Sequence, residues 1–307
     1  MFIKMDTIIM IDTTWKIQLK DLEHVLVITE HENVTLYKSI WRTFQEVCVK
    51  RIKVTTSNHK YVQREFDTLK ICAHPCVYQF YGGCVEISEN NEEYAYFLFE
   101  YMENGNLSEY MRTTQLTYPQ KCEIIRRIAI GMHYLYSRKP INIIHRDFKP
   151  ENILVNRHGE VKIADFGISK QMLNESPGTS PSGSVVHLCD LTYGSIGTVR
   201  WSAPEILYPK NGERYSHLSD IYSLGLLIYF VFTNGDVPYW KDYQNNYAKI
   251  VYAKHNNIRT FLSDIDDDPV IQDLVTRCTE RDPELRLPNP DIIIRKMITC
   301  PTRSCVL

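Results

Sequence analysis

The alternation of apolar and polar residues divides the chain into two parts. Over residues 15–100, short runs rich in β-branched and aromatic residues are typical of β-strands. One helical pattern interrupts them, with Tyr61, Phe66 and Leu69 at helical spacing. From about residue 101 onwards, longer helical patterns dominate, such as residues 121–136. The sequence therefore predicts an α+β protein, with a small β-rich part that contains one helix and a larger α-rich part.

Two further segments support this division. The stretch from Met102 to Leu107 has the turn-forming composition of a connector between the parts. Residues 224–232 form an apolar run that is too short for a bilayer, which needs about 20 residues, and this run predicts a buried helix. With 307 residues and 44% hydrophobic content, the chain can bury one or two sizeable cores.

Composition indicates a soluble protein of the cytoplasm, and a nuclear location is not excluded. The 35 basic and 37 acidic residues leave a net charge of −2, which favours neither nucleic acid nor a membrane as the principal partner. The nine cysteines are odd in number and lack CxxC pairs, as expected for reduced thiols. Asp6 and Asp12 interrupt the apolar amino terminus, which argues against a secretory signal. Cys305 lies third from the end, whereas prenylation requires the fourth position.

The candidate chemistry lies in two short motifs. The first is His145-Arg-Asp-Phe-Lys-Pro-Glu-Asn152, and the second is Asp165-Phe-Gly167. A lone Asp-Phe-Gly is compatible with a simple turn in which glycine supplies an unusual backbone angle. Together, the motifs supply carboxylates, an amide and a lysine, which are the groups that metal-assisted phosphoryl transfer needs.

These motifs resemble the catalytic loop and the metal-binding turn of eukaryotic protein kinases. The resemblance implies that Asp147 accepts the proton of the substrate hydroxyl and that Lys149 steadies the γ-phosphate of ATP. It also implies that Asn152 and Asp165 hold Mg²⁺, since both are hard oxygen donors.

Further motifs follow in the order of the kinase signature. Val47-Cys-Val-Lys50 resembles the motif that places a lysine on the α- and β-phosphates, and Glu65 is the expected partner of Lys50. Asp67 is the weaker candidate for this pairing because its side chain is shorter. Ser202-Ala-Pro-Glu205 and Arg286 match the residues that form a structural ion pair in the family.

The resemblance covers residues 15–297 and implies two lobes that close over ATP. We expect an extension at 1–14, a kinase domain at 15–300 and a tail at 301–307. The smaller lobe would span about 15–100 and the larger lobe about 101–300. Asp220 resembles the buried aspartate of the family's central helix, and Phe99 would guard the pocket behind adenine. The other residues implied in ATP binding are Ile28, Leu36, Cys48, Glu100, Met102 and Leu154.

The phosphate-covering loop departs from the family pattern. The family uses GxGxxG here, because glycine lets backbone amides approach phosphate. Residues 29–38 contain no glycine, and the first glycine of the chain is Gly82. Glu30 and Glu32 add negative charge, so we expect weakened ATP affinity. The alternative is an ordinary hairpin that is unrelated to nucleotide binding.

Smaller matches indicate the subfamily. Residues 15–22, Tyr37–Arg42 and the run from Gly197 to Glu205 resemble tyrosine-kinase-like kinases. Lys149 and Thr198 favour serine/threonine specificity, and dual specificity towards tyrosine is a smaller alternative. The sequence thus predicts an ATP- and Mg²⁺-dependent kinase of protein substrates. The runner-up is a pseudokinase or scaffold, which the missing loop glycines favour.

Two more segments carry hypotheses. Arg146 could pair with a phosphate in the hydroxyl-rich segment after Gly167, added by an upstream kinase or by autophosphorylation. The candidate sites are Thr192, Ser195 and, less strongly, Ser180; the alternative is a surface insertion that is not modified. The run from Cys72 to Cys76 offers metal-ligand types, but a structural zinc site usually needs four ligands.

Overall fold

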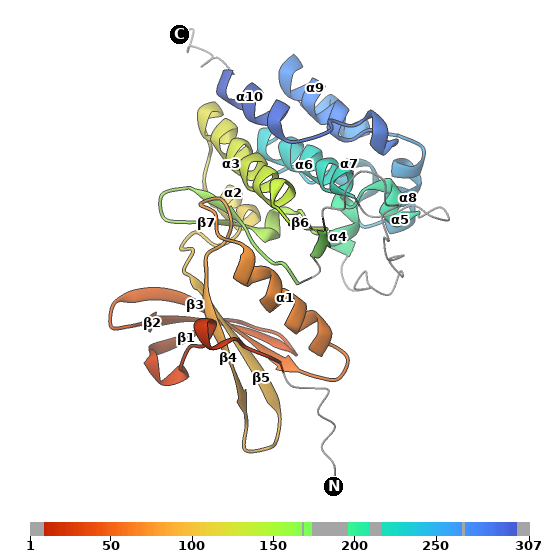
Figure 1. The fold of residues 1–307 in the computed structure, drawn as a ribbon. Helices are drawn as coiled ribbons and strands as arrows, with labels where there is room; N and C mark the ends of the chain where they lie inside the picture. The colour runs from red at the N-terminus through yellow and green to blue at the C-terminus, as the bar shows by residue number, and fades with distance from the viewer. Residues whose placement is uncertain (1–8, 168, 174–195, 209–215, 266–267, 300–307) are drawn as a thin grey trace. The chain divides into compact units, whose positions relative to one another are not determined.

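The computed structural model describes residues 9–167, 169–173, 196–208, 216–265 and 268–299 (Figure 1). The chain forms two compact units, of which the first comprises Met1–Glu103 and Ala164–Ile168. The second comprises Asn104–Ile163 and Ser169–Leu307. The three candidate phosphorylation sites and the predicted tail lie outside the described residues.

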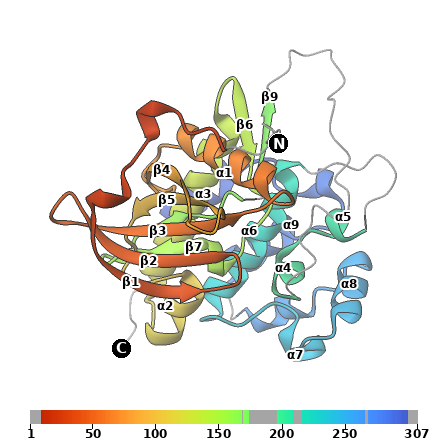
Figure 2. The ribbon, with the colours of Figure 1, turned by 90° about the horizontal axis from the view of Figure 1, so that it is seen from below.

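The first unit is built on a five-stranded antiparallel sheet with the strand order β1-β2-β3-β5-β4. Figure 2 shows β1, β2 and β3 running side by side. The alternating β-branched and aromatic residues of these segments fit a pleated, partly buried surface. The strands and the helix are β1 (Leu22–Glu30), β2 (Val34–Trp41), β3 (Gln45–Val54), α1 (His59–Ile71), β4 (Phe80–Ile87) and β5 (Glu93–Glu100).

The single helix of this unit lies where the sequence pattern predicts it. α1 buries Val62, Phe66 and Leu69, which recur at helical spacing along one face. The Phe66 ring meets Phe80 and Phe97, each with a centroid distance of 5.9 Å. Aromatic packing between α1 and the sheet therefore fixes the helix that carries Glu65.

The second unit is mainly helical and contains two small antiparallel sheets, β6 with β9 and β7 with β8. Its elements in chain order are α2 (Leu107–Thr113), α3 (Tyr118–Ser137), β6 (Ile141–Ile144), β7 (Ile153–Val155), β8 (Val161–Ile163), β9 (Lys170–Leu173), α4 (Ile196–Trp201), α5 (Pro204–Leu207), α6 (His217–Phe232), α7 (Trp240–Tyr243), α8 (Tyr247–His255), α9 (Pro269–Cys278) and α10 (Asp291–Thr299).

The helix α6 forms the core of this unit and confirms the buried helix predicted from residues 224–232. Ser216 caps it, because the hydroxyl accepts the N–H of Leu218. A Cβ on Gly225 would lie 2.5 Å from Cβ of Cys278, so α6 and α9 pack too closely here for a larger residue. In the part of the chain that is described, no helix combines the length and apolarity needed to cross a bilayer.

The two units confirm the predicted fold class. One is a small β-rich unit with one helix, and the other is a larger α-rich unit. The buried positions of the second unit follow the long helical patterns of its sequence, and those of the first follow its short strand-like runs.

Candidate active site

An ion pair joins strand β3 to helix α1 in the first unit. Lys50 Nζ lies 2.6 Å from Glu65 Oε1 and 3.9 Å from Asp165 Oδ1. Asp67, the weaker candidate of the sequence analysis, instead pairs with Lys70 at 3.0 Å. The pairing of Lys50 with Glu65 expected from the sequence is thus present, and Asp165 adds a second carboxylate.

The three charges set one another's protonation. Burial opposes the charge of Lys50, but the carboxylates of Glu65 and Asp165 outweigh it and raise the pKa of Lys50 above its ordinary value. Burial raises the pKa of Glu65, and Lys50 opposes this rise whereas Asp165 adds to it. Lys50 therefore remains a fixed cation at neutral pH.

Asp165 is presented by an unusual backbone conformation. Its φ is +61°, in the left-handed region that non-glycine residues rarely adopt. Its Oδ1 accepts the N–H of Gly167 at 3.3 Å, and a Cβ on Gly167 would lie 3.2 Å from the same oxygen. The Asp165 side chain is 49% exposed. Backbone strain of this kind is concentrated at functional sites, where it pre-organises a side chain.

The other candidate ATP-binding residues of this unit lie on the sheet and the segment after it. Ile28 is exposed on β1, Leu36 is partly buried on β2, and Cys48 is buried on β3. Glu100 ends β5, and Met102 is buried just beyond it. In the register of β3 with β5, Cys48 lies opposite Phe99.

Tyr78 is a functional candidate that the sequence analysis missed. Its ring stacks on Phe99 with a centroid distance of 4.7 Å, and its hydroxyl donates to the carbonyl of Glu100 at 2.8 Å. It is therefore placed to hold both Phe99, which is predicted to guard the pocket behind adenine, and the end of β5. No motif signals it, because the residue lies in an irregular segment before β4.

The glycine-free segment forms a tight hairpin between β1 and β2. The N–H of His31 donates to the carbonyl of Val34 at 2.9 Å, and the intervening residues 31–33 need no positive φ. Arg51 Nη2 lies 3.8 Å from Glu30 Oε1, so a cation on β3 offsets part of the loop's negative charge. Glycine is therefore not required for the turn itself.

In the second unit, the side chains of Asn152 and Lys149 meet at Asp147. Asn152 Nδ2 donates to Oδ2 and to the backbone carbonyl of Asp147, each at 2.8 Å. Lys149 Nζ lies 2.7 Å from Asp147 Oδ2 and donates to Thr198 Oγ1 at 3.2 Å. The arrangement orients a carboxylate with an amide and a lysine. Through Thr198 it also joins the loop to α4 and Ser202 after it, residues 196–202, called the α4 segment below.

Asp220 on α6 holds the backbone of this loop. Its carboxylate accepts the N–H of His145 at 2.8 Å and the N–H of Arg146 at 2.9 Å, and Tyr136 donates its hydroxyl at 3.0 Å. Arg146 has φ +71°, so these bonds stabilise a strained conformation directly before Asp147. Burial raises the pKa of Asp220, whereas His145 and the backbone donors oppose the rise.

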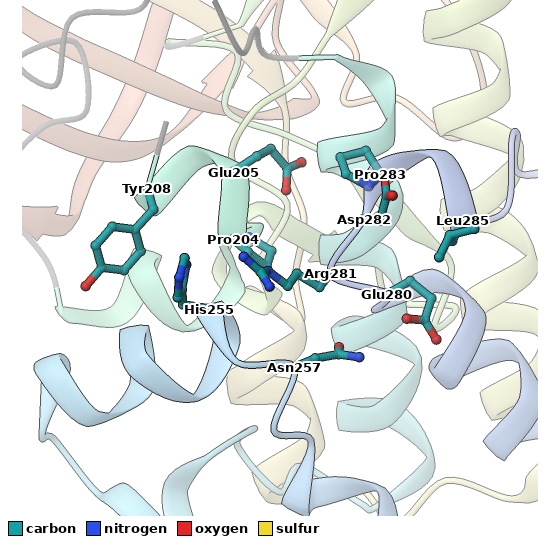
Figure 3. Close-up of a pocket in the computed structure, with 10 residues that line it drawn as sticks. All are labelled: Pro204, Glu205, Tyr208, His255, Asn257, Glu280, Arg281, Asp282, Pro283 and Leu285. Carbon is teal, nitrogen blue, oxygen red and sulfur yellow. The ribbon is translucent and has the colours of Figure 1, made fainter. Parts of the chain in front are cut away.

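A buried ion pair joins Glu205 on α5 to Arg286. Arg286 binds both oxygens of Glu205 at 2.7 Å, as the sequence predicted, and Ser219 donates to the same carboxylate at 2.8 Å. Glu205 also lines a pocket of about 460 Å³. Figure 3 shows the rings of Tyr208 and His255 next to each other at one end of this pocket, with their centroids 5.0 Å apart and their planes tilted by 56°.

Two remaining candidates have simpler surroundings. Leu154 is partly buried on β7, where it pairs with Lys162 on β8. In the segment after α1, Cys72 and Cys76 are buried and form no disulfide, and His74 Nδ1 accepts the N–H of Cys76. Across the described ranges, no three His, Cys, Asp or Glu side chains form a group that could hold a metal ion.

The comparison with known families agrees with the fold and with these motifs. A family model for the protein kinase domain matches residues 31–297, and the chain belongs to this family. Residues 31–38 of the glycine-free segment lie within this match, although they depart from the family pattern of glycines.

Relatives carry the names of both serine/threonine and tyrosine kinases. The chain is 34% identical to a probable serine/threonine-protein kinase of Dictyostelium discoideum, over 61% of the chain and 26% of the relative. It is 32% identical to the tyrosine protein-kinase src-1 of Caenorhabditis elegans, over 65% of the chain and 34% of the relative. It is 30% identical to mitogen-activated protein kinase kinase kinase 1b of Physcomitrium patens, over 74% of the chain and 26% of the relative. The matches thus span about a third or less of these relatives' lengths.

Proposed function

We propose that the chain is an ATP-dependent kinase that phosphorylates serine and threonine hydroxyls of proteins. The observation that carries this proposal is the group around Asp147, in which Lys149 bridges the carboxylate and the hydroxyl of Thr198. A carboxylate that is held by Asn152 and a lysine can accept the proton of an acceptor hydroxyl. The bond to Thr198 supports serine/threonine specificity, because it holds the α4 segment, beside which the acceptor hydroxyl would lie, close to Asp147.

The donor set fits Mg²⁺. Asn152 turns its amide nitrogen towards Asp147, which leaves the amide oxygen as the atom that could meet a cation. Asp165 contributes a half-exposed carboxylate on a strained turn. Mg²⁺ is bound through one or two such oxygens together with substrate phosphates, and when bound it neutralises phosphate charge.

The lysines divide the remaining work. Lys50, held by Glu65, would orient the α- and β-phosphates as a fixed cation. Lys149 would steady the transferred phosphoryl group, and Asp147 would take the proton of the attacking hydroxyl. Positioning and charge neutralisation account for most of the catalysis in this reaction class.

We also propose a reducing compartment, the cytoplasm or the nucleus, with activation by an upstream kinase or by autophosphorylation. Six buried cysteines form no disulfide, which supports the first part: Cys48, Cys72, Cys76, Cys84, Cys122 and Cys278. The second part rests on the hydroxyl-rich segment and on Arg146.

The test is Mg²⁺-dependent transfer of labelled γ-phosphate to dephosphorylated casein, followed by identification of the phosphorylated amino acids. We expect transfer to serine and threonine, and its loss in Lys50→Met, Asp147→Asn and Asp165→Asn. The matched control is Lys53→Met, on the same strand, because Lys53 pairs with Glu92 away from this group. It should retain activity.

Two results would contradict the proposal. Transfer to tyrosine alone would overturn the assigned specificity. No transfer by the parent chain, even at high ATP concentration and after treatment with activating kinases, would favour a scaffold whose nucleotide site is impaired by the glycine-free hairpin.

A further inference from the structure

A buried lysine that the catalytic scheme does not use lies on α8 of the second unit. Lys254 is 1% exposed, whereas lysine is almost never fully buried unless it is paired. Its Nζ donates to the carbonyl of Arg200 at 2.6 Å and to the carbonyl of Ser202 at 2.7 Å. These two carbonyls flank Trp201, so one side chain holds the backbone on both sides of it.

Aromatic rings complete the surroundings of this lysine. Nζ lies 4.8 Å from the centroid of the Tyr222 ring and 5.4 Å from that of the Tyr239 ring. Two carbonyls and two ring faces offer the ammonium group compensation for its lost hydration. Burial lowers the pKa of Lys254, and Arg286 and Arg200 act in the same direction, whereas Glu205 opposes them.

The segment that Lys254 holds leads directly to the base. Ser202 Oγ donates to the carbonyl of Thr198 at 3.0 Å, and the Ser202 N–H donates to the same carbonyl at 3.2 Å. The Thr198 hydroxyl in turn accepts from Lys149, which contacts Asp147. A continuous set of hydrogen bonds therefore runs from α8 to the proposed catalytic base.

The side chain of Arg200 binds the same segment to residues next to α7. Its guanidinium donates to the carbonyls of Pro238 and Gln244 and lies over the Trp240 ring, 5.0 Å from the centroid. The backbone of residue 200 is bound by Lys254 while its side chain is bound around α7. Lys254 on α8 and the residues next to α7 thus hold the α4 segment together, and both lie outside the catalytic loop. This arrangement is called the clamp below.

We propose that Lys254 is a positioning residue for protein-substrate recognition, because it fixes the α4 segment and thereby the Thr198 hydroxyl beside Lys149. The inference rests on the proposed function and deepens it. It assigns the recognition of the acceptor protein, and not of ATP, to a residue on α8. Loss of the hydrogen bonds in the clamp loosens the segment on which the acceptor protein would be recognised, so the effect should fall on KM for the protein substrate and not on KM for ATP.

The experiment compares Lys254→Met with the matched control Lys121→Met. Lys121 is also buried and donates to a backbone carbonyl, that of Phe232 at 3.2 Å, but it binds the end of α6 and not the α4 segment. KM and kcat are measured separately for casein and for ATP. For Lys254→Met, we expect KM for casein to rise roughly tenfold or more while KM for ATP stays within about twofold.

The control separates positioning from general stability. A variant that only unfolds more readily loses active enzyme and so lowers kcat, with KM unchanged. We expect this weaker effect, if any, from Lys121→Met. An unchanged KM for casein in Lys254→Met, or an equal rise in Lys121→Met, would overturn the proposal.

A second measurement does not depend on activity. Hydrogen exchange by mass spectrometry should show faster exchange at residues 198–202 in Lys254→Met than in the parent or in Lys121→Met. Unchanged exchange there would overturn the proposal even if the parent chain proved inactive, a result that would by itself contradict only the kinase function. If Lys254→Met does not fold, Lys254→Leu, which also removes the donor, replaces it with the same two criteria.

Discussion

Replacing Arg286 with methionine tests whether the buried ion pair stabilises the second unit. The guanidinium is fully buried and the Glu205 side chain is 8% exposed. Arg286 also donates to the carbonyls of Glu280, Leu218 and Arg281 at 2.7–3.1 Å. Arg286→Met therefore leaves a buried carboxylate without its cation and three carbonyls without this donor.

The expected cost follows from that arrangement. Removal of one partner from a buried, hydrogen-bonded ion pair costs about 3–5 kcal/mol, because the remaining charge is uncompensated. For a unit of this size, a loss of 1 kcal/mol lowers Tm by about 2–4 °C, so Arg286→Met should lower Tm by about 6–20 °C. Calorimetry and urea denaturation measure the effect.

A double-mutant cycle identifies the cause. Glu205→Gln in the Arg286→Met background removes the stranded charge, so the double variant should recover at least about 1 kcal/mol relative to Arg286→Met. The control is Arg277→Met, since Arg277 pairs with Asp273 at 3.6 Å with both side chains about half exposed. An exposed pair contributes at most about 1 kcal/mol. Equal losses from Arg286→Met and Arg277→Met, or strict additivity of the cycle, would refute the reasoning.

Three further predictions use other contacts. Asp220→Ala leaves the N–H of Arg146 without its acceptor and should lower kcat for casein at least about tenfold, since the strained loop loses its support; a kcat equal to that of the parent would contradict this. Gly225→Ala should destabilise the chain by about 1–3 kcal/mol in urea, because the new Cβ overlaps Cys278, and an unchanged midpoint would count against it. Burial raises the pKa of the Cys84 thiol to about 12, so iodoacetamide at pH 8 should label Cys84 only after unfolding. Peptide mass spectrometry can measure this, and rapid labelling of Cys84 in the native chain would contradict it.

The sequence predicted those features that depend on local pattern or on motif order. The helical spacing of Phe66 and Leu69 predicted α1, and the apolar run of residues 224–232 predicted α6. The pair of Lys50 and Glu65 could be expected because strand and helix each carry one recognisable member. Such features are encoded within a few residues, so a single sequence is sufficient to find them.

Features that depend on distant contacts could not be predicted. Lys254 follows Lys249 in a helix with a mixed surface, and nothing in its neighbourhood distinguishes a buried lysine from an exposed one. Its acceptors lie more than 50 residues away in the chain. Tyr78 likewise gains its role only when β5 brings Phe99 against its ring. Burial of a polar side chain is a tertiary property, and hydrophobic periodicity does not report it.

The glycine-free hairpin shows how a departure from a motif can leave the fold intact and still alter the chemistry. The turn closes without positive φ, and the N–H of His31 is already donated to Val34, so this amide is committed to the hairpin. In the proposed function, the attraction for phosphate then falls on Lys50 of β3 and on the Mg²⁺ that Asp165 would hold. Charge on side chains and on Mg²⁺ acts over longer distances than a backbone hydrogen bond. ATP affinity should therefore fall without being lost, and it should depend more steeply on Mg²⁺ concentration than in a kinase whose loop amides reach the phosphates.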